Sequence, residues 1–93
     1  MKNAQDLFRT VIWQCGENHQ ITIAIEELSE LIKELTKYLR NGDNEDHLSE
    51  EMADVYIMLE QLEMIFENQL EIREYRYEKL KRLRQRLHDG TDL

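Results

Sequence analysis

The sequence predicts an all-α protein: one domain over residues 1–93, built as an antiparallel four-helix bundle-like protomer that assembles into oligomers. Three observations predict this class. The chain contains no proline, the strongest helix breaker. Apolar residues recur at spacings of three and four along almost its whole length. No stretch shows the strict alternation of a half-buried strand. Short connections between the expected helices favour antiparallel neighbours.

The first two helices are defined by residues at their ends. Asn3 is a suitable N-cap for a helix that ends at Gly16, because its side-chain oxygen can accept a backbone N–H of the first turn. The second helix is expected over about residues 18–40. It ends at Asn41-Gly42, since glycine readily adopts the left-handed conformation that closes a helix.

The third helix is expected to begin at a cap provided by Asn44 or Asp46 and to run to about Glu67. Asn68 marks a break before a fourth helix over about residues 69–88. Apolar and aromatic side chains surround much of the third helix, which therefore needs cover on more than one side. One short protomer does not supply that cover, so we expect a homodimer or a homotetramer. The residues concerned are Leu48, Tyr56, Ile57, Met64 and Phe66.

Negative charge is concentrated in the middle of the chain. The formal net charge is −8, with −8 over residues 17–54 and +4 over residues 71–88. Because phosphate repels carboxylate, this balance argues against a nucleic-acid polymer as partner. It does not argue against a phosphate ligand that is bridged by a metal ion.

Several features favour a cytoplasmic protein without a membrane partner. A single cysteine excludes an internal disulfide framework. No apolar run approaches the roughly 20 residues of a membrane span. The N-terminal residues lack the apolar stretch of a signal peptide.

Two pairs of carboxylates lie on or beside the apolar faces of consecutive helices. On a helical wheel, Glu51 falls inside the apolar arc of the third helix and Asp54 at its edge. Glu27 borders the apolar arc of the second helix, and Glu30 is one turn away. An ionised carboxylate in apolar surroundings is costly unless it is paired or bound to metal. All-oxygen ligands suit Mg²⁺ or Mn²⁺.

An alternative is that these carboxylates form ion pairs with Lys33, Lys37 or the arginines of the late segment. The sequence gives less support to metal sites of other kinds. No Glu-x-x-His motif of a di-iron bundle is present. Cys15 and His19 alone cannot make a zinc site. The chain also has no glycine-rich phosphate loop.

The acidic motifs resemble a known family. Residues 26–30 read E-E-x-x-E and residues 51–54 read E-x-x-D. The pair, on consecutive helices with a short loop between them, is similar to the signature of all-α nucleoside triphosphate pyrophosphohydrolases. These include MazG-like proteins, dimeric dUTPases and dCTP pyrophosphatases. A basic stretch at 79–83 is similar to one in short members, and the resemblance covers about residues 13–90.

This resemblance implies an Mg²⁺-dependent enzyme that hydrolyses a nucleoside triphosphate, or (d)NTP, to the monophosphate and pyrophosphate. It assigns Glu27, Glu30, Glu51 and Asp54 as metal ligands. Glu27 or Glu30 would orient the attacking water. Glu26 would either support the ligands or lie exposed. Like the apolar pattern of the third helix, the resemblance implies a homo-oligomer.

Five further residues are candidate substrate contacts. Arg76 and Lys79 fall on the apolar side of the fourth helix, where they could reach a phosphate or lie with their stems on the core and their charges in water. Trp13 could stack on a base or lie in a subunit interface. Gln20 and His19 could read a base edge or serve as solvated loop and cap residues.

Two rival functions remain open at this stage. The chain could be a non-enzymatic helical interaction module whose basic fourth helix docks an acidic partner. It could also be a related enzyme that acts on another phosphorylated small molecule.

Overall fold

The computed structural model describes residues 3–90 and 93, and every regular element in that part of the chain is a helix. The helices are α1 (Ala4–Cys15), α2 (Glu17–Asn41), α3 (Glu45–Phe66) and α4 (Gln69–Asp89). The all-α class and the order of the helices are confirmed. Among the described residues, no helix is both long enough and apolar enough to cross a membrane.

Side chains and glycines define the helix ends. The Oδ1 atom of Asn3 accepts a hydrogen bond from the backbone N–H of Asp6 at 2.9 Å, as the expected N-cap should. Gly42 and Gly90 end α2 and α4 with φ of 73°, in the left-handed region that glycine tolerates best. Asn44 occupies the N-cap position of α3, but its side chain makes no capping hydrogen bond there.

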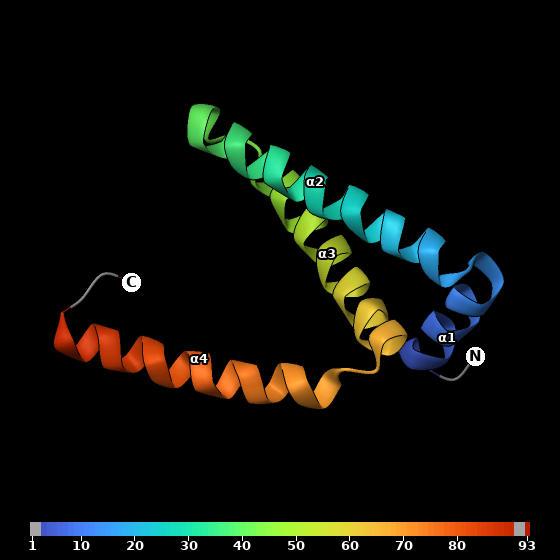
Figure 1. Cartoon of the computed structure of the whole chain (residues 1–93). Coiled ribbons are helices and arrows are strands. Elements are labelled where there is room, and N and C mark those ends of the chain that lie inside the picture. The colour runs from blue at the N-terminus through green and yellow to red at the C-terminus, as the bar shows by residue number, and fades with distance from the viewer. Residues whose placement is uncertain (1–2, 91–92) are drawn as a thin grey trace.

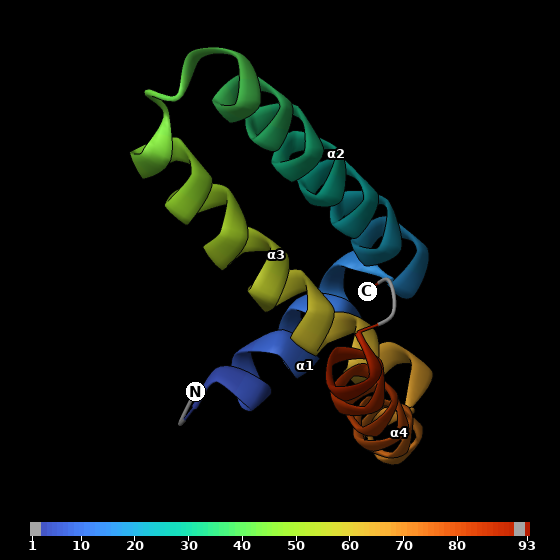
Figure 2. The same ribbon diagram turned by 90° about the vertical axis from the view of Figure 1, so that its left-hand side faces the viewer.

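The long helices α2 and α3 form an antiparallel pair, as Figures 1 and 2 show. Helix α1 packs against both of them, at the end of the pair where α2 begins and α3 ends (Figure 1). Phe8 is the buried residue of α1. The interior is small and mixes apolar with polar side chains. Its buried members are Phe8, Ala24, Val55, Met58, Gln20, Glu34 and Gln61.

Helix α4 leaves the end of α3 and runs away from the α2–α3 pair (Figure 1). None of the residues that it contributes is buried. The resulting shape is extended: the Cα radius of gyration is 16.7 Å, against about 12 Å for a compact domain of this length. The four-helix bundle of the sequence prediction is therefore not completed by α4 within one described protomer. The helix predicted over about residues 69–88 is confirmed as α4. This helix does not pack along the α2–α3 pair of its own chain.

Candidate metal centre

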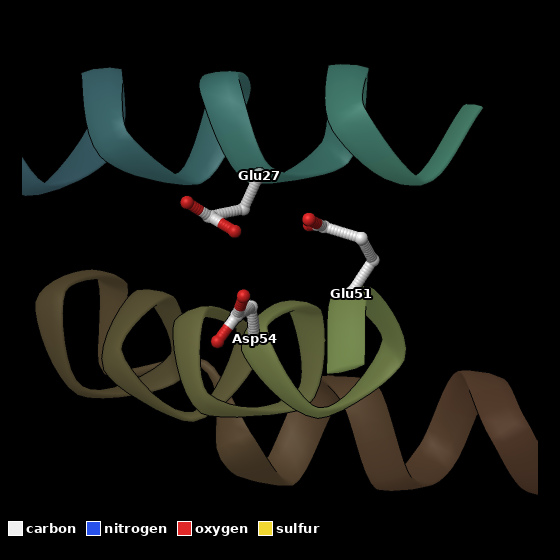
Figure 3. Close-up of side chains that lie close together, drawn as sticks. All are labelled: Glu27, Glu51 and Asp54. Atoms are coloured by element: carbon white, nitrogen blue, oxygen red, sulfur yellow. The ribbon is translucent and has the colours of Figure 1, made fainter. Parts of the chain in front are cut away.

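Three carboxylates meet between α2 and α3. Glu27 reaches from α2, and Glu51 and Asp54 reach from α3, so that the three side chains point toward one another across the helix pair (Figure 3). One carboxylate oxygen from each lies within 4.8 Å of the other two. All three residues are half-buried. This arrangement follows from the sequence spacing, because residues three apart on a helix share a face.

One oxygen of this group lacks a hydrogen-bond partner. Oε2 of Glu51 is buried and accepts no hydrogen bond from the described residues. No lysine or arginine of the described residues forms an ion pair with Glu27, Glu51 or Asp54. A buried acceptor without a partner costs roughly 1–3 kcal/mol, and more when it is charged. Binding of a cation, or of protons, would therefore stabilise this group of carboxylates.

The electrostatics of Glu27 agree with this. Burial raises the pKa of Glu27 above its ordinary value of 4.5, and the negative charges of Asp54 and Glu51 raise that pKa further. A carboxyl with a raised pKa is one whose ionised form is disfavoured by its surroundings. A divalent cation would reverse that preference, because its positive charge stabilises the ionised form.

The donor set fits a hard divalent ion. It consists of carboxylate oxygens alone, which suit Mg²⁺ or Mn²⁺, and it contains no nitrogen or sulfur ligand of the kind that zinc and copper sites commonly use. Ligand atoms about 2.1 Å from Mg²⁺ lie at most about 4.2 Å apart. Small side-chain rotations would bring oxygens that are now within 4.8 Å of one another to that spacing.

Glu30 does not belong to the group in this structure. It is exposed, and the group of carboxylates consists of Glu27, Glu51 and Asp54. Three residues correspond to about 300° around a helix, so Glu30 is turned about 60° from Glu27. That rotation carries its carboxylate away from α3. Glu26 is also exposed, which agrees with one of the two roles expected for it.

Gln20 faces the interior. It is 5 % exposed, and its Nε2 donates a hydrogen bond to Oε1 of Gln61 at 2.8 Å. Its own Oε1 lies 2.7 Å from Nδ1 of His19, which is itself exposed. Both ends of the Gln20 amide are thus engaged within the protein. In this protomer Gln20 joins α2 to α3, and it is not presented to a nucleotide base.

The other candidate substrate contacts lie on the surface. Trp13 is 84 % exposed, so it is accessible for either role that the sequence leaves open. Arg76 and Lys79 are exposed on α4. Because α4 runs away from the α2–α3 pair (Figure 1), these two side chains do not meet the carboxylates within one protomer.

A buried acid, Glu34, lies toward the other end of the helix pair, where α2 ends. Glu34 is 6 % exposed, and Asn44 donates to its backbone oxygen at 2.9 Å and to its Oε2 at 2.7 Å. Lys37 lies 3.5 Å from Oε1 of Glu34. The hydrogen bond from Asn44 is the main reason that the pKa of Glu34 is lowered, and the charge of Lys37 adds to it. Lys37, one of the residues that the alternative interpretation pairs with the clustered carboxylates, thus forms its ion pair with Glu34.

Sequence reasoning missed the roles of Asn44 and Gln61. Asn44 was expected as a cap, and nothing in the pattern of α3 indicates that its amide binds a residue of α2 instead. Gln61 lies on the inward side of α3, as Glu51 does, and a polar residue there was a signal that a wheel could have found.

A groove of about 840 Å³ lies at the junction of α1, the end of α3 and the start of α4. None of the three clustered carboxylates lines it. Its lining includes both basic and acidic residues: Arg9, Arg73, Glu60, Glu63 and Glu67. The groove and the carboxylate group are therefore separate features of the protomer.

Comparison with known proteins gives no match. No protein-family model, no curated protein and no solved structure matches the chain. The resemblance of the E-E-x-x-E and E-x-x-D motifs is accordingly one of short motifs.

Proposed function

We propose that the protein is a nucleotide pyrophosphohydrolase that uses Mg²⁺, or Mn²⁺, to hydrolyse a (d)NTP to the monophosphate and pyrophosphate. The observation that carries this proposal is the meeting of Glu27, Glu51 and Asp54, whose carboxylate oxygens lie within 4.8 Å of one another. The unpartnered buried oxygen of Glu51 supports it. The short-motif resemblance supplies the reaction class.

The proposed roles in metal binding and proton transfer belong to residues of α2 and α3. Glu27, Glu51 and Asp54 would hold the cation. When bound, Mg²⁺ supplies charge neutralisation for a polyphosphate and lowers the pKa of a water molecule. Glu30, exposed one turn from Glu27, or Glu27 itself would accept a proton from the water that attacks the α-phosphorus. The bond from that phosphorus to the bridging oxygen breaks, and pyrophosphate leaves.

The decisive experiment is a panel of (d)NTPs and other phosphorylated small molecules assayed for pyrophosphate and phosphate release with Mg²⁺ present. We expect release of pyrophosphate from at least one (d)NTP. Glu51→Gln and Asp54→Asn should each abolish it. The matched control is Glu50→Gln, an exposed neighbour on the same helix, which should retain activity. Folded protein that releases pyrophosphate from none of these compounds would contradict the proposal.

The second candidate is a helical interaction module, and the projecting α4 favours it. This helix carries seven lysines and arginines and none of its residues is buried. A module of this kind would dock an acidic partner and would not bind a metal. Thermal melting with and without Mg²⁺ separates the two functions, because an ion that binds only the folded state raises the Tm.

A further inference from the structure

Helix α2 carries a second apolar seam that faces away from its own protomer. Apolar residues recur along it at alternating steps of four and three, the heptad spacing by which helices pair side by side. They are Ile21, Ile25, Leu28, Ile32, Leu35 and Leu39. Most of them are exposed in the protomer, with values of 59 % for Ile25 and 65 % for Ile32. The seam is thus separate from the side that packs on α3 through Ala24.

Helix α3 carries a matching exposed seam, formed by Met52, Tyr56, Leu59 and Phe66. On each helix the seam lies about 100–115° further round than the side that faces the other helix, counted in the direction of the sequence. Because α2 and α3 run antiparallel (Figure 2), these two equal rotations turn both seams to the same side of the pair. We call this common surface the outer face of the α2–α3 pair.

The protomer exposes more surface than a free monomer of its size. Its accessible surface is 7781 Å², whereas a compact monomer of 11.3 kDa exposes about 5,700 Å². The excess is about 2,000 Å². Obligate homodimers bury roughly 2,000–5,000 Å² in total, or about half of that on each chain. The excess therefore has the size of one half of an obligate interface.

The opposite charges of α3 and α4 favour a second copy of the chain as the molecule that covers this surface. Outside the carboxylate group, α3 carries five acids and no lysine or arginine. Helix α4 carries seven lysines and arginines against four acids. The protomer does not pack these two complementary helices along each other (Figure 1). A second copy supplies both an apolar seam to cover the outer face and a basic helix to lie beside the acidic α3.

We propose that the outer face of the α2–α3 pair is the site at which a second copy of the chain binds, with the apolar seams of the two copies in contact. The basic α4 of each copy then runs beside the acidic α3 of the other. This inference does not rest on the proposed function, because it uses none of the clustered carboxylates. It specifies which surface forms the homo-oligomer and predicts that other surfaces, such as the side of α2 that bears Thr22, stay exposed.

The first test compares two substitutions to the same residue on one helix. Ile32→Glu places a charge in the seam, and Thr22→Glu places it on an exposed side of α2 outside the seam, about 80° round the helix from Ile32. Light scattering should give wild type and Thr22→Glu a mass of at least two chains of 11.3 kDa. Ile32→Glu should raise the dissociation constant by about 100-fold or more, since a two-fold interface loses two buried isoleucines.

A loss of folding in the variant can be distinguished from a loss of the interface. In a monomer, Ile32 is a surface residue and its replacement would leave the Tm nearly unchanged. A large loss of Tm in Ile32→Glu, with Thr22→Glu unaffected, therefore supports the interface. Wild-type protein with the mass of one chain at all concentrations overturns the proposal. An Ile32→Glu protein that remains as oligomeric as wild type overturns it too.

Thiol labelling provides a test that disturbs the surface less. Ile32→Cys and Thr22→Cys are made in the background of Cys15→Ser, which removes the native thiol. We expect maleimide to modify Cys at position 32 at least about tenfold more slowly than at position 22, because access controls thiol reactivity. Dilution below the dissociation constant should abolish the difference. Equal rates in the concentrated protein would show that the outer face is not covered by a second copy.

Discussion

Replacing Glu27 with glutamine is expected to have opposite effects on stability with and without Mg²⁺. Without the ion, Glu27 faces two other carboxylates whose oxygens lie within 4.8 Å. At that separation each pair of unit charges repels by about 0.9 kcal/mol in water-like surroundings. Glu27→Gln removes two such repulsions, so the metal-free variant should be about 1–2 kcal/mol more stable than wild type at pH 7.

With Mg²⁺ the order should reverse. An ion at about 100 times its Kd stabilises the folded state by about 2.7 kcal/mol, which corresponds to roughly 10–20 °C in Tm for a domain of this size. Glu27→Gln loses a charged ligand and should lose most of that gain. Glu26→Gln, an exposed neighbour on α2, should behave as wild type does in both conditions.

The pH dependence gives a further check. The pKa of Glu27 is raised in the folded state, so folding favours its protonated form. The destabilising effect of its charge is therefore absent below its ordinary pKa of 4.5 and develops as the pH rises through that value and the raised folded one. Metal-free wild type and Glu27→Gln should thus converge in stability below pH 4.5. Thermal and urea melts in EDTA measure this difference. The reasoning is refuted if metal-free Glu27→Gln is less stable than wild type at pH 7.

Three other predictions concern the residues that hold the helices together. Phe8→Ala should destabilise the protein by about 3–5 kcal/mol in urea unfolding, because Phe8 is the buried residue of α1; an unchanged midpoint would mean that α1 is not docked. Gln61→Leu should cost about 1–3 kcal/mol by leaving the amide of Gln20 without its partner, and adding Gln20→Leu should recover most of the loss; a double variant no better than the single one would contradict this. Glu34→Gln should be less stable than wild type at pH 7, because the lowered pKa of Glu34 adds stability above pH 4.5 that is lost as the pH falls through the folded pKa. Melts at graded pH measure this, and a difference in stability that persists well below the folded pKa would show that the charge of Glu34 does not cause it.

The sequence places Glu27, Glu51 and Asp54 on or beside the facing sides of two consecutive helices, because those positions depend mainly on helical periodicity. Glu51 and Asp54 are brought to one face of α3 by a spacing of three, and a wheel shows that this face is the apolar one. The same rule groups Glu30 with Glu27, but Glu30 is exposed and lies outside the group of three carboxylates in the protomer. A spacing of three brings two side chains near each other, but it does not turn both of them toward the same neighbouring helix.

Contacts between distant parts of the chain were beyond the sequence. The partner of Gln20 stands 41 residues away, and no local pattern relates the two amides. Asn44 likewise follows a turn in which its cap role and its bond to Glu34 were equally compatible with the residue type. The stripe of α4 predicted a helix that packs, yet periodicity does not say whether it packs on its own chain or on another.

The buried pair of Gln20 and Gln61 has a consequence for the register of the helix hairpin. Two helices that meet through small and aliphatic side chains can slide past each other by one turn, about 5.4 Å, with little change in apolar contact. Such a slip would break the hydrogen bond between the two amides. It would also carry Glu27 out of reach of the carboxylates on α3, which now lie within 4.8 Å. The hydrogen bond of 2.8 Å between two uncharged side chains thus favours the alignment in which the three carboxylates meet.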